Sequence, residues 1–343
     1  MNEPLHPSSL GEILDRTVQL YRSRFLVFFG IAVIPIAVVL AFAAIFFLAI
    51  TWIGADGKTA LSPAAVVLAV VFFIVLVLVA LPVCLAVTAL GTAALNHAVA
   101  SAWRDEIITI RDAYKSAWQR GWSYIGLFLL ETLLVWVTPF VAWFVLVFVG
   151  AGAAALAQST GMGGAVAALV GLGAVLAIAA LIGYCIWMLL RLSLAFPASV
   201  MERMSATAAI KRSFSLCLGT RGRIFLLYLL GMALNYIFSL VIMVPVLIVI
   251  ALLPGANNPQ NAASAGMVMV FTMYCAAFAI QALTKPVYGI ALMLFYYDQR
   301  IRKEGYDIEW LMQRAGLAAP APPQAQQLQQ FTEPTQQASQ ESL

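Results

Sequence analysis

Long apolar runs alternate with short polar joints along this chain. Six of the runs are nearly free of charged residues, and each exceeds the ~20 residues that a helix needs to cross a bilayer. The six runs cover residues 25–52, 64–102, 122–157, 165–190, 224–253 and 266–297. This pattern predicts an all-α, polytopic membrane protein with six transmembrane helices.

The composition supports that prediction. Of the 343 residues, 63% are hydrophobic and 10% are charged, and the mean hydropathy is +0.95. A soluble domain would carry roughly 25% charged residues. We therefore expect membrane lipids as partners, and we expect no nucleic-acid partner.

The joints between the runs differ in charge, and the difference predicts an orientation. Joints 55–63, 158–164 and 254–265 hold only Asp56 and Lys58 as charged residues. The other joints and both chain ends hold the clusters of Arg and Lys. Because basic segments remain on the cytoplasmic side of a membrane, we expect both termini to lie in the cytoplasm.

A short amphipathic segment precedes each pair of apolar runs. Ser9 with Glu12 forms a capping-box pattern, Thr109 with Asp112 resembles it, and a third segment starts at Ser205. An interfacial amphipathic helix followed by a helical hairpin thus recurs about every 100 residues. The predicted repeats cover about residues 9–103, 107–200 and 205–304.

The composition changes sharply near residue 315. Residues 1–314 are predicted to form the six-helix membrane domain, whereas residues 315–343 are rich in Pro and Gln. Such a segment cannot bury a core. We expect a disordered cytoplasmic tail, which is a candidate binding segment for a protein partner.

Proline and small residues predict how the helices bend and pack. Gly173 and Ala177, four residues apart in the fourth run, indicate that this helix approaches a neighbour closely. Proline interrupts five of the six runs and is expected to kink them. These prolines are Pro35, Pro82, Pro139, Pro245 and Pro286.

Four arginines at the ends of the amphipathic segments are candidate contacts for anionic lipid headgroups. They are Arg22, Arg24, Arg221 and Arg223. A basic residue near an anionic membrane surface contributes about 1 kcal/mol. Anchoring of an interfacial helix is enough to account for their position, and a dedicated lipid site is the other interpretation.

Two full charges lie within the apolar runs, at Glu131 and Lys285. An isolated charge in the hydrocarbon costs at least ~2.5–3.5 kcal/mol, so each is expected to face a partner or a cavity. One hypothesis is a mid-membrane polar site that also includes Gln281 and Asn235. The other is structural: a buried salt bridge between the two charges, or Lys285 bonded to carbonyls that Pro286 exposes.

The sequence offers little support for catalysis. Its two histidines, His6 and His97, are far apart, and no GxSxG, P-loop or Rossmann pattern is present. The four cysteines are isolated in apolar stretches and are interpreted as packing residues. We expect no enzyme activity, no metal site and no cofactor.

Three boundary motifs resemble a known family. They are SLGEILDRTVQLYRSRF at 9–25, RLSLAFPASVMERMSATAAIKRSFSL at 191–216 and KPVYGIALMLFYYDQRIRKEGYDIEWL at 285–311. Over about residues 9–312, the chain resembles the bacterial membrane-protein family named for the membrane domain of glycerophosphoryl diester phosphodiesterases.

The resemblance implies an integral membrane protein without the catalytic domain. The phosphodiesterase domain of fused members needs a metal-binding set of His, Glu and Asp, which has no counterpart in this sequence. The leading expectation is a non-enzymatic membrane protein associated with lipid or envelope homeostasis. The alternative is a small-molecule or ion transporter that uses the region of Glu131 and Lys285.

Overall fold

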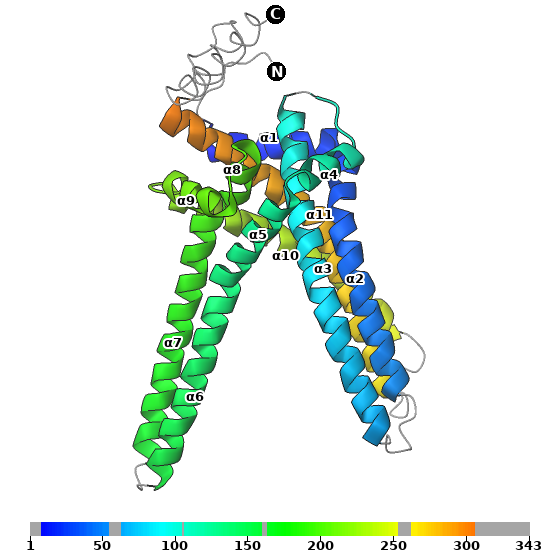
Figure 1. Cartoon of the computed structure of the whole chain (residues 1–343), viewed down its shortest axis with the longest axis vertical. Coiled ribbons are helices and arrows are strands. Elements are labelled where there is room, and N and C mark those ends of the chain that lie inside the picture. The colour runs from blue at the N-terminus through cyan, green and yellow to red at the C-terminus, as the bar shows by residue number, and fades with distance from the viewer. Residues whose placement is uncertain (1–7, 55–62, 105, 160–162, 253–261, 306–343) are drawn as a thin grey trace, which may run out of the picture. The chain divides into compact units, whose positions relative to one another are not determined.

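The computed structural model describes residues 8–54, 63–104, 106–159, 163–252 and 262–305, and every regular element in these ranges is helical (Figure 1). The long helices are α2 (Phe25–Gly54), α3 (Pro63–Trp103), α6 (Thr138–Ser159), α7 (Gly163–Leu192), α10 (Arg221–Leu252) and α11 (Ala262–Glu304). The shorter elements are α1 (Leu10–Ser23), α4 (Ile110–Trp118), α5 (Gly121–Thr132), the π-helical segment η1 (Leu133–Val137), α8 (Ala195–Met201) and α9 (Ala206–Leu216).

Six spans in the described chain are long and apolar enough to cross a membrane. They are Phe25–Ile50, Ala64–Trp103, Gly121–Ser159, Val166–Met201, Arg221–Val249 and Met269–Glu304. The all-α class and the six membrane-spanning helices expected from the apolar runs are thereby confirmed. The chain is a multi-pass membrane protein.

The chain divides into two units. The larger covers Ser8–Tyr296, and the described part of the smaller covers residues 297–305. In the smaller unit, Arg302 contacts Asp298 at 3.0 Å and Arg300 contacts Glu304 at 3.2 Å. The predicted tail at 315–343 and most of the weakly charged joints lie outside the described residues.

The three short helices α1, α4 and α9 begin as the capping patterns predict. Ser9 and Glu12 form both hydrogen bonds of a capping box, and the Thr109 hydroxyl accepts from the Asp112 amide at 3.2 Å. Ser205 occupies the N-cap of α9 without a side-chain capping bond. Each helix turns small residues inward: Thr17, Ala113, Ala117, Ala209 and Ser213 are all buried.

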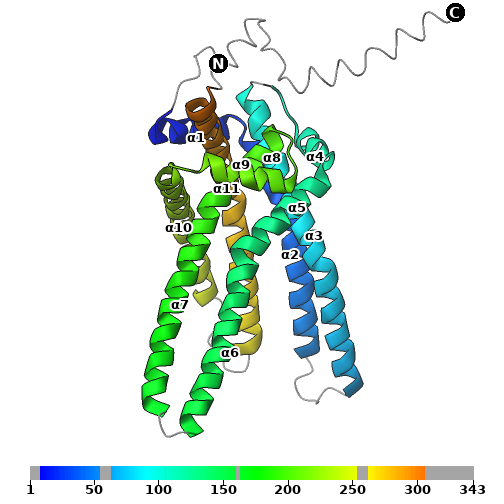
Figure 2. The same ribbon diagram turned by 60° about the vertical axis from the view of Figure 1, so that its left-hand side comes forward.

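The long helices associate in pairs. Helix α2 lies beside α3, and α6 lies beside α7 (Figures 1 and 2). Helices α10 and α11 are joined by Asn235, whose amide donates to the Thr284 hydroxyl at 3.1 Å. The core forms mainly near the C-terminal end of α3, because Ala93, Ala94 and Ala98 are fully buried there. Alanines permit such close helix contact.

The prediction from small residues in the fourth run is wrong. A Cβ atom added at Gly164, Gly171 or Gly173 would meet nothing within 4 Å, so α7 does not use these glycines for close approach. Close approach occurs instead on α3 and α11. A Cβ atom at Gly91 would lie 2.9 Å from Pro35, and one at Gly289 would lie 2.6 Å from Leu95.

Tyrosines donate to carbonyls beside the helix prolines. Pro35 lacks the N–H that would bond to the Ile31 carbonyl, and the Tyr114 hydroxyl donates to that carbonyl at 2.9 Å. In α11, the Leu283 carbonyl lies just before Pro286 and accepts from the Tyr21 hydroxyl at 3.0 Å. Burial raises the pKa of Tyr114 to about 12, so its hydroxyl remains a donor at neutral pH.

Backbone carbonyls near Pro139 likewise accept hydrogen bonds from side chains of another helix. The π-helical segment η1 ends two residues before this proline, and Pro139 has no N–H to offer the Val135 carbonyl four residues earlier. Helix α7 supplies donors, because Tyr184 donates to the Leu134 carbonyl at 3.0 Å and Cys185 donates to the Val135 carbonyl at 3.6 Å. An unsatisfied carbonyl in hydrocarbon costs several kcal/mol, which explains why polar side chains occupy these positions.

Three arginines tie segments that are distant in the sequence. Arg24 donates to the Glu106 carbonyl, just before α4. Arg120 donates to the Arg203 carbonyl, just before α9. The third contact runs from Arg223 to the Ser8 carbonyl at 3.0 Å, just before α1. Each arginine near the start of a membrane span thus holds the backbone that leads into a short amphipathic helix.

Glu202 links the end of α11 to α9. The Tyr296 hydroxyl donates to Glu202 at 2.5 Å, and Arg212 contacts the same carboxylate oxygen at 2.9 Å. Tyr296 is fully buried, so this polar group needs a partner.

Replacing Tyr114 with Phe tests whether the donated hydrogen bond stabilises the fold. The change leaves the Ile31 carbonyl unpaired, so we expect a loss of about 1–3 kcal/mol in the free energy of unfolding. Denaturation of the purified protein in detergent measures it. Tyr236→Phe is the matched control, because Tyr236 is 64% exposed. Equal stability of the two variants would contradict the assigned role.

Candidate functional site

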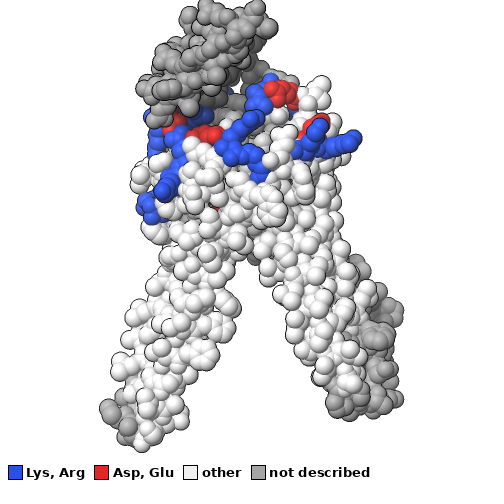
Figure 3. Space-filling view, viewed as in Figure 1, with Lys and Arg blue, Asp and Glu red and all other residues white. Residues whose placement is uncertain are grey.

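Charged side chains in the larger unit gather at one end of the long helices. Figure 3 shows Lys and Arg over α1, α4 and α9 on the visible face, while the visible surface of the spans away from that end is almost free of charged side chains. Lys285 departs from this pattern because it lies on α11 within a membrane span. Glu131 is the corresponding acid, on α5.

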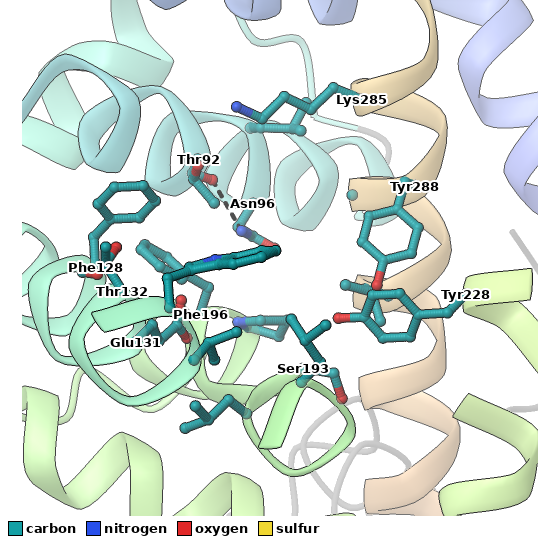
Figure 4. A pocket seen from close by; sticks show the side chains of 18 residues that line it. Thr92, Asn96, Phe128, Glu131, Thr132, Ser193, Phe196, Tyr228, Lys285 and Tyr288 are labelled. Carbon is teal, nitrogen blue, oxygen red and sulfur yellow. Dashed lines mark hydrogen bonds between the residues drawn. The ribbon is translucent and has the colours of Figure 1, made fainter. Parts of the chain in front are cut away.

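Both charges line one cavity of about 270 Å³, which we call the polar cavity. Its walls come from α3, α5, η1, α7, α8, α10 and α11 (Figure 4). The polar residues among its lining are Thr92, Asn96, Glu131, Thr132, Ser193, Tyr228, Lys285 and Tyr288. Trp136, Phe128 and Phe196 add aromatic surface. The remainder of the wall is mostly aliphatic.

Most neutral polar groups of this wall bond to their own helices. The Asn96 amide donates to the Thr92 carbonyl at 2.9 Å (Figure 4), and the Thr132 hydroxyl donates to the Phe128 carbonyl at 2.8 Å. The Ser193 hydroxyl donates to the Leu190 carbonyl at 3.0 Å. The two hydroxyl hydrogens and one of the two Asn96 amide hydrogens are therefore used, while the side-chain oxygens retain acceptor capacity.

Glu131 and Lys285 face the polar cavity from different walls. Figure 4 shows Lys285 extending from α11 and Glu131 on the side formed by α5. Within the described ranges, no ion pair joins these two side chains, and Lys285 makes no hydrogen bond to a carbonyl near Pro286. Neither contact of the structural hypothesis is formed. The free-energy cost of placing each charge within the membrane span is therefore not offset by a contact between the two side chains.

Two tyrosines form the wall between α10 and α11. The rings of Tyr228 and Tyr288 lie 4.8 Å apart between centroids. The Tyr288 oxygen is buried and lacks a hydrogen-bond partner of standard geometry in the described chain. Gly231 permits this arrangement, because an added Cβ atom would lie 3.2 Å from the Tyr288 ring.

Gln281 and Asn235, the other two residues of the predicted polar site, do not line the polar cavity. Gln281 is exposed on α11, and Asn235 is bonded to Thr284 between α10 and α11. Helical spacing brings Gln281 near Lys285 along the axis, but the two side chains do not reach the same space.

The four arginines predicted to contact headgroups have different environments. Arg22 is exposed. Arg24 and Arg223 bind the backbone before neighbouring helices, and Arg223 also lies over the Phe295 ring at 5.3 Å. The Nε atom of Arg221 is buried without a hydrogen-bond partner in the described chain. Of the four, only Arg22 presents its charge mainly outward.

His97 and the four cysteines, which are also chemically reactive, do not gather in one site. His97 contacts the Tyr124 hydroxyl at 3.2 Å, and none of the four cysteines, all of them within the described ranges, forms a disulfide. No cluster of three or more His, Cys, Asp or Glu side chains that could hold a metal ion occurs among the residues that the structure describes.

Several lining residues were not identified from the sequence. Tyr228, Tyr288 and Ser193 are neutral residues in or beside apolar runs, so no charge marks them. A usable signal was present at positions 228 and 288, where a tyrosine lies within an apolar run and close to a glycine.

Comparisons with family models, with curated proteins and with solved structures found no match. The family resemblance of the boundary motifs therefore stays a prediction. The functional argument rests on the polar cavity and on the charged end of the helices.

A double-mutant cycle on Glu131→Gln and Lys285→Met tests the absence of a direct ion pair. Distant residues without a shared partner have additive effects within about 0.3–0.5 kcal/mol, but residues that line one cavity can couple more strongly. Because Glu131 and Lys285 line the polar cavity without a direct contact, we expect the losses in free energy of unfolding of the two single variants to sum to that of the double variant within about 1 kcal/mol. The measurement is denaturation in detergent. A coupling of 2 kcal/mol or more, on the order of that of a close charged pair, would restore the salt-bridge hypothesis.

Proposed function

We propose that this chain is a non-enzymatic, lipid-associated protein of the bacterial cytoplasmic membrane, with a role in lipid or envelope homeostasis. The observation that carries the proposal is the surface of α1, α4 and α9. Exposed bases lie on all three short helices at the charged end of the spans, and on α1 and α4 they lie beside exposed large apolar side chains. Helices of this kind lie in the membrane interface.

Particular residues illustrate this surface. On α4, Lys115 is exposed, and the adjacent Trp118 is 75% exposed. On α1, Arg22 is exposed, and Val18 is 52% exposed. A tryptophan at the interface places its ring at headgroup level, while a nearby base meets anionic phosphates. The arrangement favours lipid contact without any requirement for catalysis.

The proposal includes three repeats and two cytoplasmic termini. The contacts of Arg24, Arg120 and Arg223 support the repeats, because each reaches the backbone before the next short helix and the third returns to the first. An even number of spans and the gathering of bases at one end support the orientation. The Pro/Gln-rich tail would then be available to a cytoplasmic protein partner.

The polar cavity favours a second candidate function, transport of a small molecule or ion. Glu131 and Lys285 line it without pairing, and the π-helical segment and Pro286 interrupt regular helix nearby. Transporter sites are commonly built at such interruptions. An amino acid carries both charges and is the matching class of small solute.

Neutralising the exposed bases of the short helices tests the leading proposal. The variant combines Arg22→Gln, Arg111→Gln, Lys115→Gln and Lys211→Gln, four positions that are exposed on α1, α4 and α9. At about 1 kcal/mol each near an anionic surface, we expect the ratio of anionic to zwitterionic phospholipid that co-purifies to fall at least tenfold. Mass spectrometry of lipids retained in mild detergent measures the ratio.

The matched control keeps every charge by exchanging Arg and Lys at the same four positions. It is expected to retain lipid like the unaltered chain. If neutralisation and exchange gave the same lipid ratio, the interfacial bases would not bind anionic lipid, and the proposal would lose its main support.

Uptake by proteoliposomes tests the transport alternative. With radiolabelled amino acids as probes, a transport site in the polar cavity predicts uptake that Glu131→Gln abolishes and that Gln281→Leu leaves unchanged, because only Glu131 lines the cavity. Uptake equal to that of empty vesicles would count against the alternative.

A further inference from the structure

The polar cavity is adjoined by a second hollow, which we call the apolar groove. It has a volume of about 510 Å³ between α6 and α7, and Trp136, Pro139, Trp143, Ile182 and Ile186 belong to its lining. Trp136 lines both the polar cavity and the apolar groove. The two hollows are therefore neighbours around one indole ring, and together they offer a polar end and an apolar end.

The apolar groove faces the region that lipid occupies. Trp136 is 62% exposed, Ile182 is 55% exposed and Ile186 is 41% exposed, and all three lie within membrane spans. A molecule in the bilayer that enters the groove thus contacts Trp136, the residue that the groove shares with the polar cavity. The groove lining is hydrocarbon and aromatic, which suits an alkyl chain and offers nothing to a charged solute.

The polar cavity has the opposite chemistry. Its carboxyl group at Glu131 and its ammonium group at Lys285 are not paired with each other. A ligand that carries both an ammonium and an anionic oxygen meets both groups with charge-assisted hydrogen bonds. Oxygens of Thr132 and Ser193 add acceptors, and the buried Tyr288 hydroxyl adds a polar group without a protein partner of standard geometry in the described chain.

We propose that the polar cavity and the apolar groove together bind one zwitterionic phospholipid whose headgroup carries a free ammonium. The headgroup phosphate contacts Lys285, the headgroup ammonium donates to Glu131, and an acyl chain lies along the apolar groove past Trp136. This inference deepens the proposed association with lipids and rests on it. It adds a single site, at a place distinct from the exposed bases of α1, α4 and α9.

The occupant follows from the combination of the two hollows. A water-soluble zwitterion would fill the polar cavity and leave the groove unused, whereas a hydrocarbon would leave both charges uncompensated. A phospholipid that lacks a cation would meet Lys285 and leave Glu131 without a partner. A trimethylated ammonium has no N–H to donate to Glu131 and should bind more weakly than a primary ammonium.

Native mass spectrometry with added short-chain lipids tests the site. The full chain, purified in mild detergent, is titrated with phosphatidylethanolamine, phosphatidylcholine and phosphatidylglycerol of equal chain length. We expect one phosphatidylethanolamine per chain, bound at least tenfold more tightly than the other two. Free phosphoethanolamine, the headgroup without chains, should bind at least tenfold more weakly than the lipid.

Substitutions test separately the headgroup contacts in the polar cavity and the acyl-chain contacts in the apolar groove. Glu131→Gln should remove the preference for phosphatidylethanolamine over phosphatidylglycerol, and Lys285→Met should weaken all three lipids. Ile182→Trp fills the groove on an exposed surface and should weaken lipid binding without altering phosphoethanolamine binding. Gln281→Leu is the control on α11 outside the cavity, and it should change nothing.

Equal affinity for the three lipids, or an unchanged preference in Glu131→Gln, would overturn the inference. So would unaltered lipid binding in Ile182→Trp, whose exposed position allows folding even if the cavity variants fail to fold. Tight binding of phosphoethanolamine alone would assign the cavity to a soluble zwitterion instead. If any of these results were found while the amount of co-purifying anionic lipid still depended on the exposed bases of α1, α4 and α9, the proposed function would stand without this site.

Discussion

A polar group that lacks a hydrogen-bond partner carries a large free-energy cost in the hydrocarbon interior of a membrane, and this constraint organises the described structure. Prolines at 35, 139 and 286 interrupt three spans, and the carbonyls near them accept from Tyr114, Tyr184 and Tyr21. The donors come from elsewhere in the chain, so each interruption also becomes a contact between helices. The hydrogen bonds that satisfy the interrupted backbone therefore also hold neighbouring helices together.

The same constraint makes the polar cavity informative. Where the chain could have paired Glu131 with Lys285, it places them on separate walls of a hollow of about 270 Å³. Nearby hydroxyl and amide donors are used within their own helices, so the two charges are the groups with the most bonding capacity left. With the apolar groove next to Trp136, the cavity matches an amphiphile better than a fully soluble solute.

The sequence allowed the class of fold to be predicted because apolar run length is a local property. Capping at Ser9 and Thr109 was likewise readable from neighbouring residues. The partners of Arg24, Arg120 and Arg223 were not, since each lies more than 80 positions away. The prediction of close packing through Gly173 is wrong for a similar reason: a small residue permits close approach, but only the partner helix decides whether it occurs. Of the predicted polar site, Glu131 and Lys285 line one cavity, and their charge within apolar runs made them recognisable in the sequence. Gln281 lies one helical turn before Lys285 on the same side of α11 but outside the cavity, because the neighbouring helices set how far the cavity extends along α11.

The central claim is that the polar cavity holds a zwitterionic headgroup between Lys285 and Glu131. A cryo-electron microscopy map of the full chain in a lipid nanodisc that contains phosphatidylethanolamine tests it most directly. The account predicts headgroup density within hydrogen-bond distance of both side chains, continuous with chain density beside Trp136. An empty cavity, or Glu131 and Lys285 in direct contact with each other, would contradict it.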